Sequence, residues 1–278
     1  MITKDTLHTF NDTHRTLVKT EGFVYLFPHP ELLPRISNYT ITFPHECIMS
    51  DEYAVIPHGC ATLVLSSSDK GTSINLFGPA TKPVSIGAAA NRSKLLFIVE
   101  FQPAGYYAFS GIPQKELTDC VLPFEIVNPA LNQLLIQQIE KSRDIHSLIA
   151  EIDRLFLTHL KIDSFRAEFS LANDIIVKNG GVVSVKALSN NTYFSERHLS
   201  RIFTEYMGVN IKSFSRLVRV NKAIRLLRNP RYSITMACFQ TGYYDIPHFI
   251  HDFKLICGIT PQEYRNNLSD FYSEIAKF

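Results

Sequence analysis

The chain has 278 residues, of which 45% are hydrophobic, and its formal net charge is +2. This length suits one or two packed domains, and the absence of an apolar run of about 18 residues excludes a membrane-spanning helix. The first residues lack the basic-then-apolar layout of a secretion signal, so we expect a cytoplasmic protein that does not act in a membrane.

The N-terminal part of the sequence predicts a β-rich domain, which we place at residues 1–125. Residues 1–20 are polar, and we expect them to form a loose arm. Beyond residue 22, β-branched and aromatic runs separated by Pro, Gly, Ser and Asp predict short strands: YTITF (39–43), ATLVL (61–65), SINLF (73–77) and LLFIVEF (95–101). Many short strands with turn-rich spacing indicate a barrel or sandwich of the cupin-like kind.

Two connecting helices are predicted over residues 126–162. Apolar residues recur there three and four positions apart, as in Ile145, Leu148, Ile149 and Ile152. Such amphipathic helices either pack on the β-rich domain or pair between two subunits, and the sequence leaves both arrangements open.

The remaining residues, 163–278, predict an all-α domain that repeats itself at an offset of 50. Residue types are kept at matched positions, such as Ala187 and Ala237, Ser195 and Asp245, His198 and His248, Phe203 and Phe253, and Gly208 and Gly258. A small residue, a helix cap, apolar residues one turn apart and a glycine stop predict two helix-turn-helix units. A long helix near 213–228 joins them, and Thr260 to Glu263 predict a capping box.

Positive charge gathers in this repeated region. Residues 163–278 hold 15 Lys and Arg against 10 Asp and Glu, whereas residues 1–162 hold 13 against 16. Basic side chains clustered on helices are typical of proteins that bind nucleic-acid phosphates. Two helical units in tandem suit a polymer with a repeating groove, which is duplex DNA.

The segment MACFQTGYYDIPHFIHDFKLICGITPQEYR (236–265) resembles the signature of AraC/XylS-type transcription regulators, and residues 195–228 resemble their first reading helix and linker helix. The resemblance implies a seven-helix domain whose two reading helices enter successive major grooves of DNA. It also implies RNA polymerase as a partner, and activation rather than repression. Residues 57–65 and 99–124 resemble a β-rich N-terminal domain of some such regulators.

The predicted function is therefore sequence-specific, DNA-binding transcription regulation. Its control would come from a small-molecule effector or from homodimerisation through the N-terminal domain. The alternative is an effector-independent regulator whose N-terminal domain is structural. The sequence names no ligand, so it assigns no residues to a cofactor or effector.

We expect the DNA contacts to come from both units. The first reading helix and the start of the linker helix offer Arg197, Ser200, Arg201, Thr204, Lys212 and Arg216. The second reading helix offers Ile246, Pro247, His248, Ile250 and His251. Because isoleucine and proline cannot make the bidentate base contacts of arginine, we expect the first unit to specify the sequence and the second to position the domain.

An enzymatic function is not predicted. The sequence has no G-x-S-x-G, P-loop or G-x-G-x-x-G motif, and His29, His45 and His58 lack the spacing of a metal-binding cupin. Five cysteines without C-x-x-C spacing favour buried, reduced thiols, and Cys47 and Cys120 lack a neighbouring cation that would favour the thiolate. We expect no catalytic residue, metal or cofactor.

Overall fold

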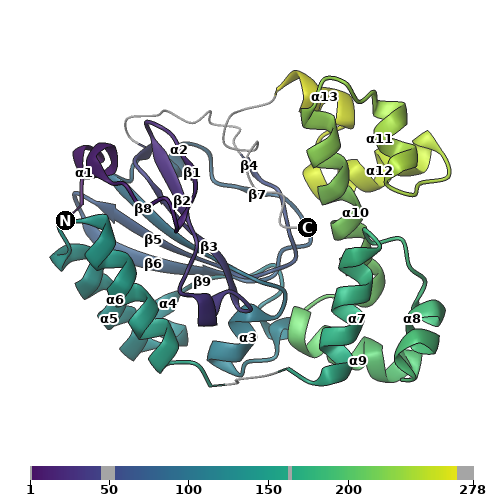
Figure 1. Cartoon of the computed structure of the whole chain (residues 1–278), viewed down its shortest axis with the longest axis horizontal. Coiled ribbons are helices and arrows are strands. Elements are labelled where there is room, and N and C mark those ends of the chain that lie inside the picture. The colour runs from purple at the N-terminus through teal and green to yellow at the C-terminus, as the bar shows by residue number, and fades with distance from the viewer. Residues whose placement is uncertain (1, 45–53, 162–164, 268–278) are drawn as a thin grey trace.

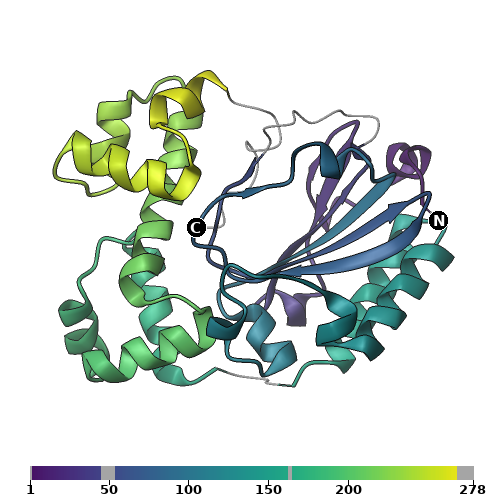
Figure 2. The ribbon, with the colours of Figure 1, turned by 180° about the vertical axis from the view of Figure 1, so that it is seen from behind.

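A computed structural model of the chain describes residues 2–44, 54–161 and 165–267 (Figure 1). A curved β-sheet with helices along one side forms the N-terminal part, and a group of helices stands beside it. The view from behind shows the same two parts (Figure 2).

The N-terminal part is built on a seven-stranded antiparallel sheet in the order β1-β2-β3-β8-β5-β6-β9. Its strands are β1 (Thr16–Lys19), β2 (Phe23–Leu26), β3 (Ile36–Thr42), β5 (Thr62–Ser68), β6 (Gly71–Phe77), β8 (Leu95–Phe101) and β9 (Val121–Pro123). A second sheet pairs β4 (Ala54–Val55) with β7 (Val84–Ser85). The four runs that the sequence predicts as strands overlap β3, β5, β6 and β8, with only Phe43 and Ala61 one residue outside them, so the β-rich character of the N-terminal part is confirmed.

One face of the large sheet is apolar because its strands alternate. In β5, Leu63 and Leu65 are buried while their neighbours are partly exposed. Opposite them in β8, Phe97 and Val99 are fully buried. This face carries the core of the N-terminal part.

Helices α5 (Pro129–Lys141) and α6 (Ile145–Thr158) cover that core (Figure 1). Their apolar stripes, including Leu135 of α5 and Ile152 of α6, are fully buried against it. Of the two arrangements open to these helices, the structure shows packing on the β-rich domain. Asp153 of α6 points inward and accepts hydrogen bonds from the Tyr39 hydroxyl (2.9 Å) and the His29 backbone N–H (3.0 Å).

The expectation of a loose N-terminal arm is wrong. Residues Lys4–Thr9 form helix α1, and β1 pairs with β2 at the sheet edge. Ile2, Leu7 and Phe10 are buried in the core, and the Phe10 ring lies 4.6 Å from that of His146. Only one side of this segment packs against the core, so a few apolar residues on that side hold it in place although most of its residues are polar.

Short helices fill the connections of the N-terminal part. They are η1 (Pro30–Leu32), α2 (Gly87–Ala90), α3 (Gly105–Ser110), η3 (Gln114–Glu116) and α4 (Phe124–Val127). Helix α3 and η3 lie on the side that faces the second group of helices.

The C-terminal part contains seven helices within the described residues, as the resemblance implies. They are α7 (Ala167–Lys178), α8 (Val185–Thr192), α9 (Glu196–Met207), α10 (Ile211–Arg228), α11 (Ile234–Gln240), α12 (Ile246–Cys257) and α13 (Pro261–Asn266). The pairs α8–α9 and α11–α12 are the predicted helix-turn-helix units. Each has its own apolar core, and α10 contributes Phe214 and Val218 to the first core and Leu217 and Ile224 to the second.

The predicted caps of the reading helices are present. The Ser195 side chain accepts a hydrogen bond from the His198 N–H at 3.3 Å, and Asp245 accepts one from the His248 N–H at 2.7 Å. Thr260 and Glu263 form the capping box of α13. Local sequence therefore fixes where each reader begins.

The structured N-terminal segment gives a stability prediction. We expect Leu7→Ala to lower the free energy of unfolding by about 2–5 kcal/mol, because Leu7 is fully buried and its truncation leaves a cavity. Urea denaturation of the full chain measures the change, with the exposed Thr9→Ala as control. Equal stability of wild type and Leu7→Ala would contradict the burial of this segment.

Candidate nucleic-acid interface

Helix α9 presents the predicted residues of the first unit on one face. Arg197, Ser200, Arg201 and Thr204 are spaced three and four positions apart, so they share a side of the helix. Both arginines are exposed, whereas Ser200 and Thr204 are half-buried. The Thr204 hydroxyl donates to the Ser200 carbonyl at 2.9 Å, so it is partly engaged within the helix.

Charge on this face is not neutralised within the described parts of the chain. No acidic side chain there lies within ion-pair distance of Arg197 or Arg201. Lys212, in the first turn of α10, is also exposed. These cations can therefore meet an anionic polymer without first breaking an internal ion pair.

Two contacts of His198 stabilise the start of α9, one with an aromatic ring and one with a carboxylate. The Phe194 and His198 rings stack with centroids 5.4 Å apart, and His198 Nε2 lies 3.2 Å from Glu168 Oε1 of α7. These contacts fix the first turn of the reading helix, because they join it to the turn before it and to a neighbouring helix.

Helix α12 presents a different surface. Ile246 and Ile250 are half-buried against the second core, while Pro247, His248 and His251 are exposed. Pro247 lies in the first turn, where its missing N–H has no helical partner to lose. The exposed surface of this reader is consequently apolar and imidazole-bearing in its first turns, without arginine, and its lysine, Lys254, is exposed in the last turn.

Asp252 of α12 is a buried carboxylate that holds the second reader to α10. Its side chain is 2% exposed. Arg216 Nε of α10 lies 3.1 Å from Asp252 Oδ1, an ion pair whose geometry is not that of an aligned hydrogen bond. Arg219 of the same helix approaches Oδ2 at 4.0 Å, and its guanidinium lies 4.7 Å from the centre of the Tyr243 ring.

The second unit itself completes the surroundings of Asp252. The Tyr243 hydroxyl donates to Oδ2 at 3.2 Å, and burial together with this carboxylate raises the pKa of Tyr243. His248 Nε2 lies 3.5 Å from Oδ2 and His251 Nδ1 lies 3.6 Å from Oδ1. The buried charge is thus faced by two guanidinium groups, one phenol and two imidazoles.

This arrangement changes the roles open to Arg216. The sequence predicts it as a DNA contact, but its guanidinium is half-buried and engaged with Asp252. The sequence alone did not predict a role for Asp252. The one local indication of such a role is its position four residues after His248, because an acid is unexpected on a helix that is predicted to contact DNA.

Other candidate chemistry lies apart from this interface. Cys238 and Cys257 are buried free thiols whose pKa burial raises, which disfavours the reactive thiolate. Cys120 is half-buried, and Cys47 and His45 fall outside the described residues.

Where the chain is described, no group of three or more His, Cys, Asp or Glu is placed to hold a metal ion. No helix in the same residues is long and apolar enough to cross a membrane.

The two parts of the chain touch at the end of the first reader. Thr118 donates a hydrogen bond to the Gly208 carbonyl at 2.9 Å. The Tyr107 hydroxyl donates to Glu205 at 3.2 Å, and the Tyr107 and Tyr206 rings lie 4.5 Å apart. The C-terminal end of α9 is therefore fixed to the N-terminal part.

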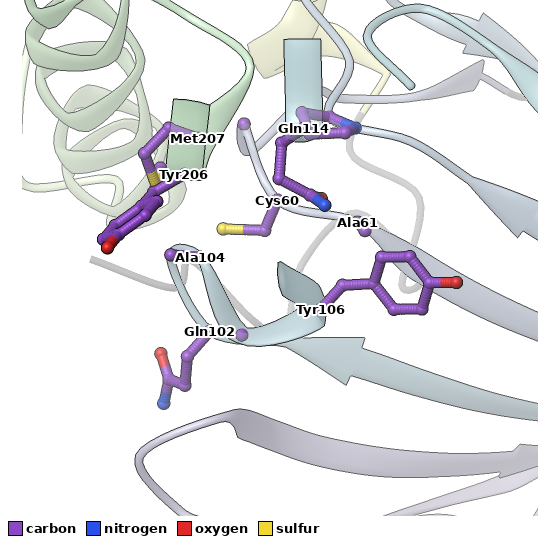
Figure 3. Close-up of a pocket in the computed structure, with 11 residues that line it drawn as sticks. Cys60, Ala61, Gln102, Ala104, Tyr106, Gln114, Tyr206 and Met207 are labelled. Carbon is purple, nitrogen blue, oxygen red and sulfur yellow. The ribbon is translucent and has the colours of Figure 1, made fainter. Parts of the chain in front are cut away.

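A small pocket lies at this contact (Figure 3). Cys60, Gln102 and Tyr106 line it from the sheet side, and Tyr206 and Met207 line it from α9. Figure 3 shows the Cys60 side chain pointing toward the two α9 residues. The lining atoms pack too closely to leave room for a ligand.

Two family models match the chain. A helix-turn-helix domain matches residues 188–267, and a domain of unknown function (DUF6597) matches residues 25–123. The first covers both reading units, and the second covers most of the sheet.

Two similar proteins are described as operon regulatory proteins. The chain is 34% identical over 83 residues to the F1 operon positive regulatory protein of Yersinia pestis, covering 30% of this chain and 28% of that protein. It is 24% identical over 169 residues to the Msm operon regulatory protein of Streptococcus mutans, covering 59% and 60%. The chain thus matches less than two thirds of either relative.

A solved structure is also similar. It is a transcriptional regulator from Chromobacterium violaceum, described as containing an AraC-type DNA-binding domain, with 24% identity and a TM-score of 0.34. The likeness covers 37% of this chain and 95% of that one.

The buried carboxylate gives a prediction about the second unit. Asp252→Asn keeps the side-chain shape but leaves Arg216 and Arg219 facing each other without a counter-charge. We expect the free energy of unfolding to fall by about 1–3 kcal/mol, measured by urea denaturation. The matched control is Asp245→Asn, an exposed N-cap at which asparagine caps equally well. Similar losses for both variants would contradict the role of Asp252.

Proposed function

We propose that this chain, which carries an AraC-type helix-turn-helix domain over residues 188–267, is a sequence-specific DNA-binding transcription regulator. The observation that carries the proposal is the mounting of two helix-turn-helix units on one helix, α10. The exposed cations Arg197, Arg201 and Lys212 supply a surface for phosphates or bases on the first unit.

The length of α10 supports binding to successive grooves. Its 18 residues span about 27 Å, and one helical turn of duplex DNA measures about 34 Å. The first core uses α10 as far as Val218, and the second core uses it from Leu217 onward. Two readers held at this spacing suit adjacent major grooves on one side of the duplex.

The two readers contribute unequally in this proposal. Arg197 and Arg201 on α9 can pair with the two acceptors of guanine, with Ser200 and Thr204 beside them. On α12, Pro247 and the partly exposed Ile246 and Ile250 can touch thymine methyl groups but cannot form such pairs. His248 and His251, which also face Asp252, are suited to phosphate contacts that position the domain.

We further propose that the N-terminal domain, residues 1–125 with the connecting helices 126–162, controls the readers through its contact with α9. A small-molecule effector or a second copy of the chain would act on that domain. Since the apolar stripes of α5 and α6 are buried within the chain, a homodimer would use other surfaces. The alternative is an effector-independent regulator whose N-terminal domain is structural.

The family likeness also underlies our proposal for the cellular location, mode of action and partner of this regulator. We propose a cytoplasmic, non-enzymatic activator that works with RNA polymerase on duplex DNA. The printed description of the Yersinia pestis relative as a positive regulatory protein supports activation.

Binding to DNA is tested with the full chain. We expect it to bind duplex DNA, and we expect the logarithm of affinity to fall linearly as the logarithm of salt concentration rises, because bound cations release counterions. Fluorescence anisotropy at several salt concentrations measures both. If the full chain bound no duplex at low salt, the proposed function would be wrong.

The asymmetry of the readers is tested on duplexes selected from a random library and on scrambled duplexes. Arg201→Ala should weaken the selected site by about 1–3 kcal/mol and relax the base preference there. His251→Ala should cost less and affect both duplexes alike. Equal losses on the two duplexes for Arg201→Ala, or a larger loss of specificity for His251→Ala, would contradict the asymmetric model.

A further inference from the structure

Each helix-turn-helix unit exposes one tyrosine almost completely. Tyr193 is 94% exposed and Tyr244 is 93% exposed, the highest values among the large apolar and aromatic side chains that the structure describes. Burying apolar ring surface favours folding, so a ring that contacts almost nothing in its own chain contributes little to stability. Exposure of a tyrosine in both units calls for a reason outside the fold.

Both tyrosines lie in the turn just before a reading helix, although not at matching positions of the two units. Tyr193 lies two residues before Ser195, the N-cap of α9, and Tyr244 lies directly before Asp245, the N-cap of α12. In a helix-turn-helix unit the N-terminal residues of the reading helix approach the base edges. A side chain in the turn just before that end lies at the rim of the groove, beside the phosphates.

The fold uses the neighbouring aromatic residues instead. Phe194 stacks on His198, and Tyr243 is buried against Asp252 and Arg219. In each turn one aromatic residue packs and an adjacent tyrosine points away from the chain. The pattern therefore recurs in two turns that differ in length and in their packing partners.

The backbone at Tyr193 adds a second observation. Its φ of +60° is left-handed, a conformation that disfavours a bulky residue, whereas the turn of the second unit uses Gly242 at φ +78° for this purpose. A glycine or asparagine would relieve the strain at no cost in packing. Strain retained at an exposed residue points to a function for its side chain.

We propose that Tyr193 and Tyr244 are DNA-backbone contacts, one for each reader. Each phenol donates a hydrogen bond to a phosphate oxygen at the rim of the groove, and each ring lies along the adjoining sugar. Such contacts fix the register of the reading helices and carry no sequence information. The proposal rests on the proposed function, because it assumes that α9 and α12 face DNA.

A neutral donor leaves a distinctive signature in binding. Loss of a lysine or arginine contact reduces the salt dependence of binding, because fewer counterions are released. Loss of a phenol hydroxyl weakens binding without changing that slope. Because the contact ignores the bases, the loss is the same on selected and scrambled duplexes.

The experiment compares the full chain with Tyr193→Phe, Tyr244→Phe and Tyr193→Gly on both duplexes at several salt concentrations. Each phenylalanine variant should bind about 3- to 10-fold more weakly, equally on the two duplexes and with an unchanged salt slope. Tyr193→Gly should lose at least as much affinity while its thermal midpoint stays the same or rises, since glycine accepts the left-handed backbone. That combination separates lost contact from lost folding.

The control is Ile126→Ala, which removes another exposed apolar side chain, 73% exposed, from α4 of the N-terminal part. It should bind both duplexes as the wild type does. Wild-type binding by the tyrosine variants, or a loss confined to the selected duplex, would overturn this inference and leave the proposed function standing. Failure of the wild type to bind any duplex would instead overturn the proposed function and this inference with it.

Discussion

The sharing of helix α10 between two apolar cores is the constraint on which the C-terminal part depends. Phe214 and Leu217 are three residues apart, yet they belong to different cores. Neither reading unit can rotate about α10 without exposing apolar surface, whose burial stabilises the domain by roughly 25 cal/mol per Å². The separation and relative orientation of α9 and α12 are therefore properties of one rigid helix rather than of a flexible linker.

Charge is distributed unequally on this shared support. Two cations in the first half of α10, Arg216 and Arg219, turn toward the buried carboxylate of Asp252, and the imidazoles of α12 face the same group. On the first unit, Arg197 and Arg201 remain exposed to solvent. One carboxylate thus anchors the second reader to α10 and faces its two imidazoles, whereas the arginines of the first reader face no such acid within the described residues.

Local signals in the sequence were sufficient for much of this architecture. The helix caps at Ser195 and Asp245 act within three residues, and the strand alternation of β5 reports burial directly. The contact between Arg216 and Asp252 joins residues 36 positions apart in sequence, so no local sequence pattern predicts it. The N-terminal segment was misjudged for a related reason: the partners of Leu7 and Phe10 come from distant elements, and its composition alone is polar.

The glycines that end the two reading helices have a second role at the boundary between the two parts of the chain. A Cβ atom on Gly208 would lie 2.4 Å from Thr118 Oγ1, and one on Gly258 would lie 3.1 Å from Pro83 Cγ. Both close approaches are to the N-terminal part, and both occur at the helix ends opposite those that carry the N-caps. The N-terminal part therefore lies against the C-terminal end of each reader, so the glycine that stops each reading helix also leaves room for the rest of the chain to approach it.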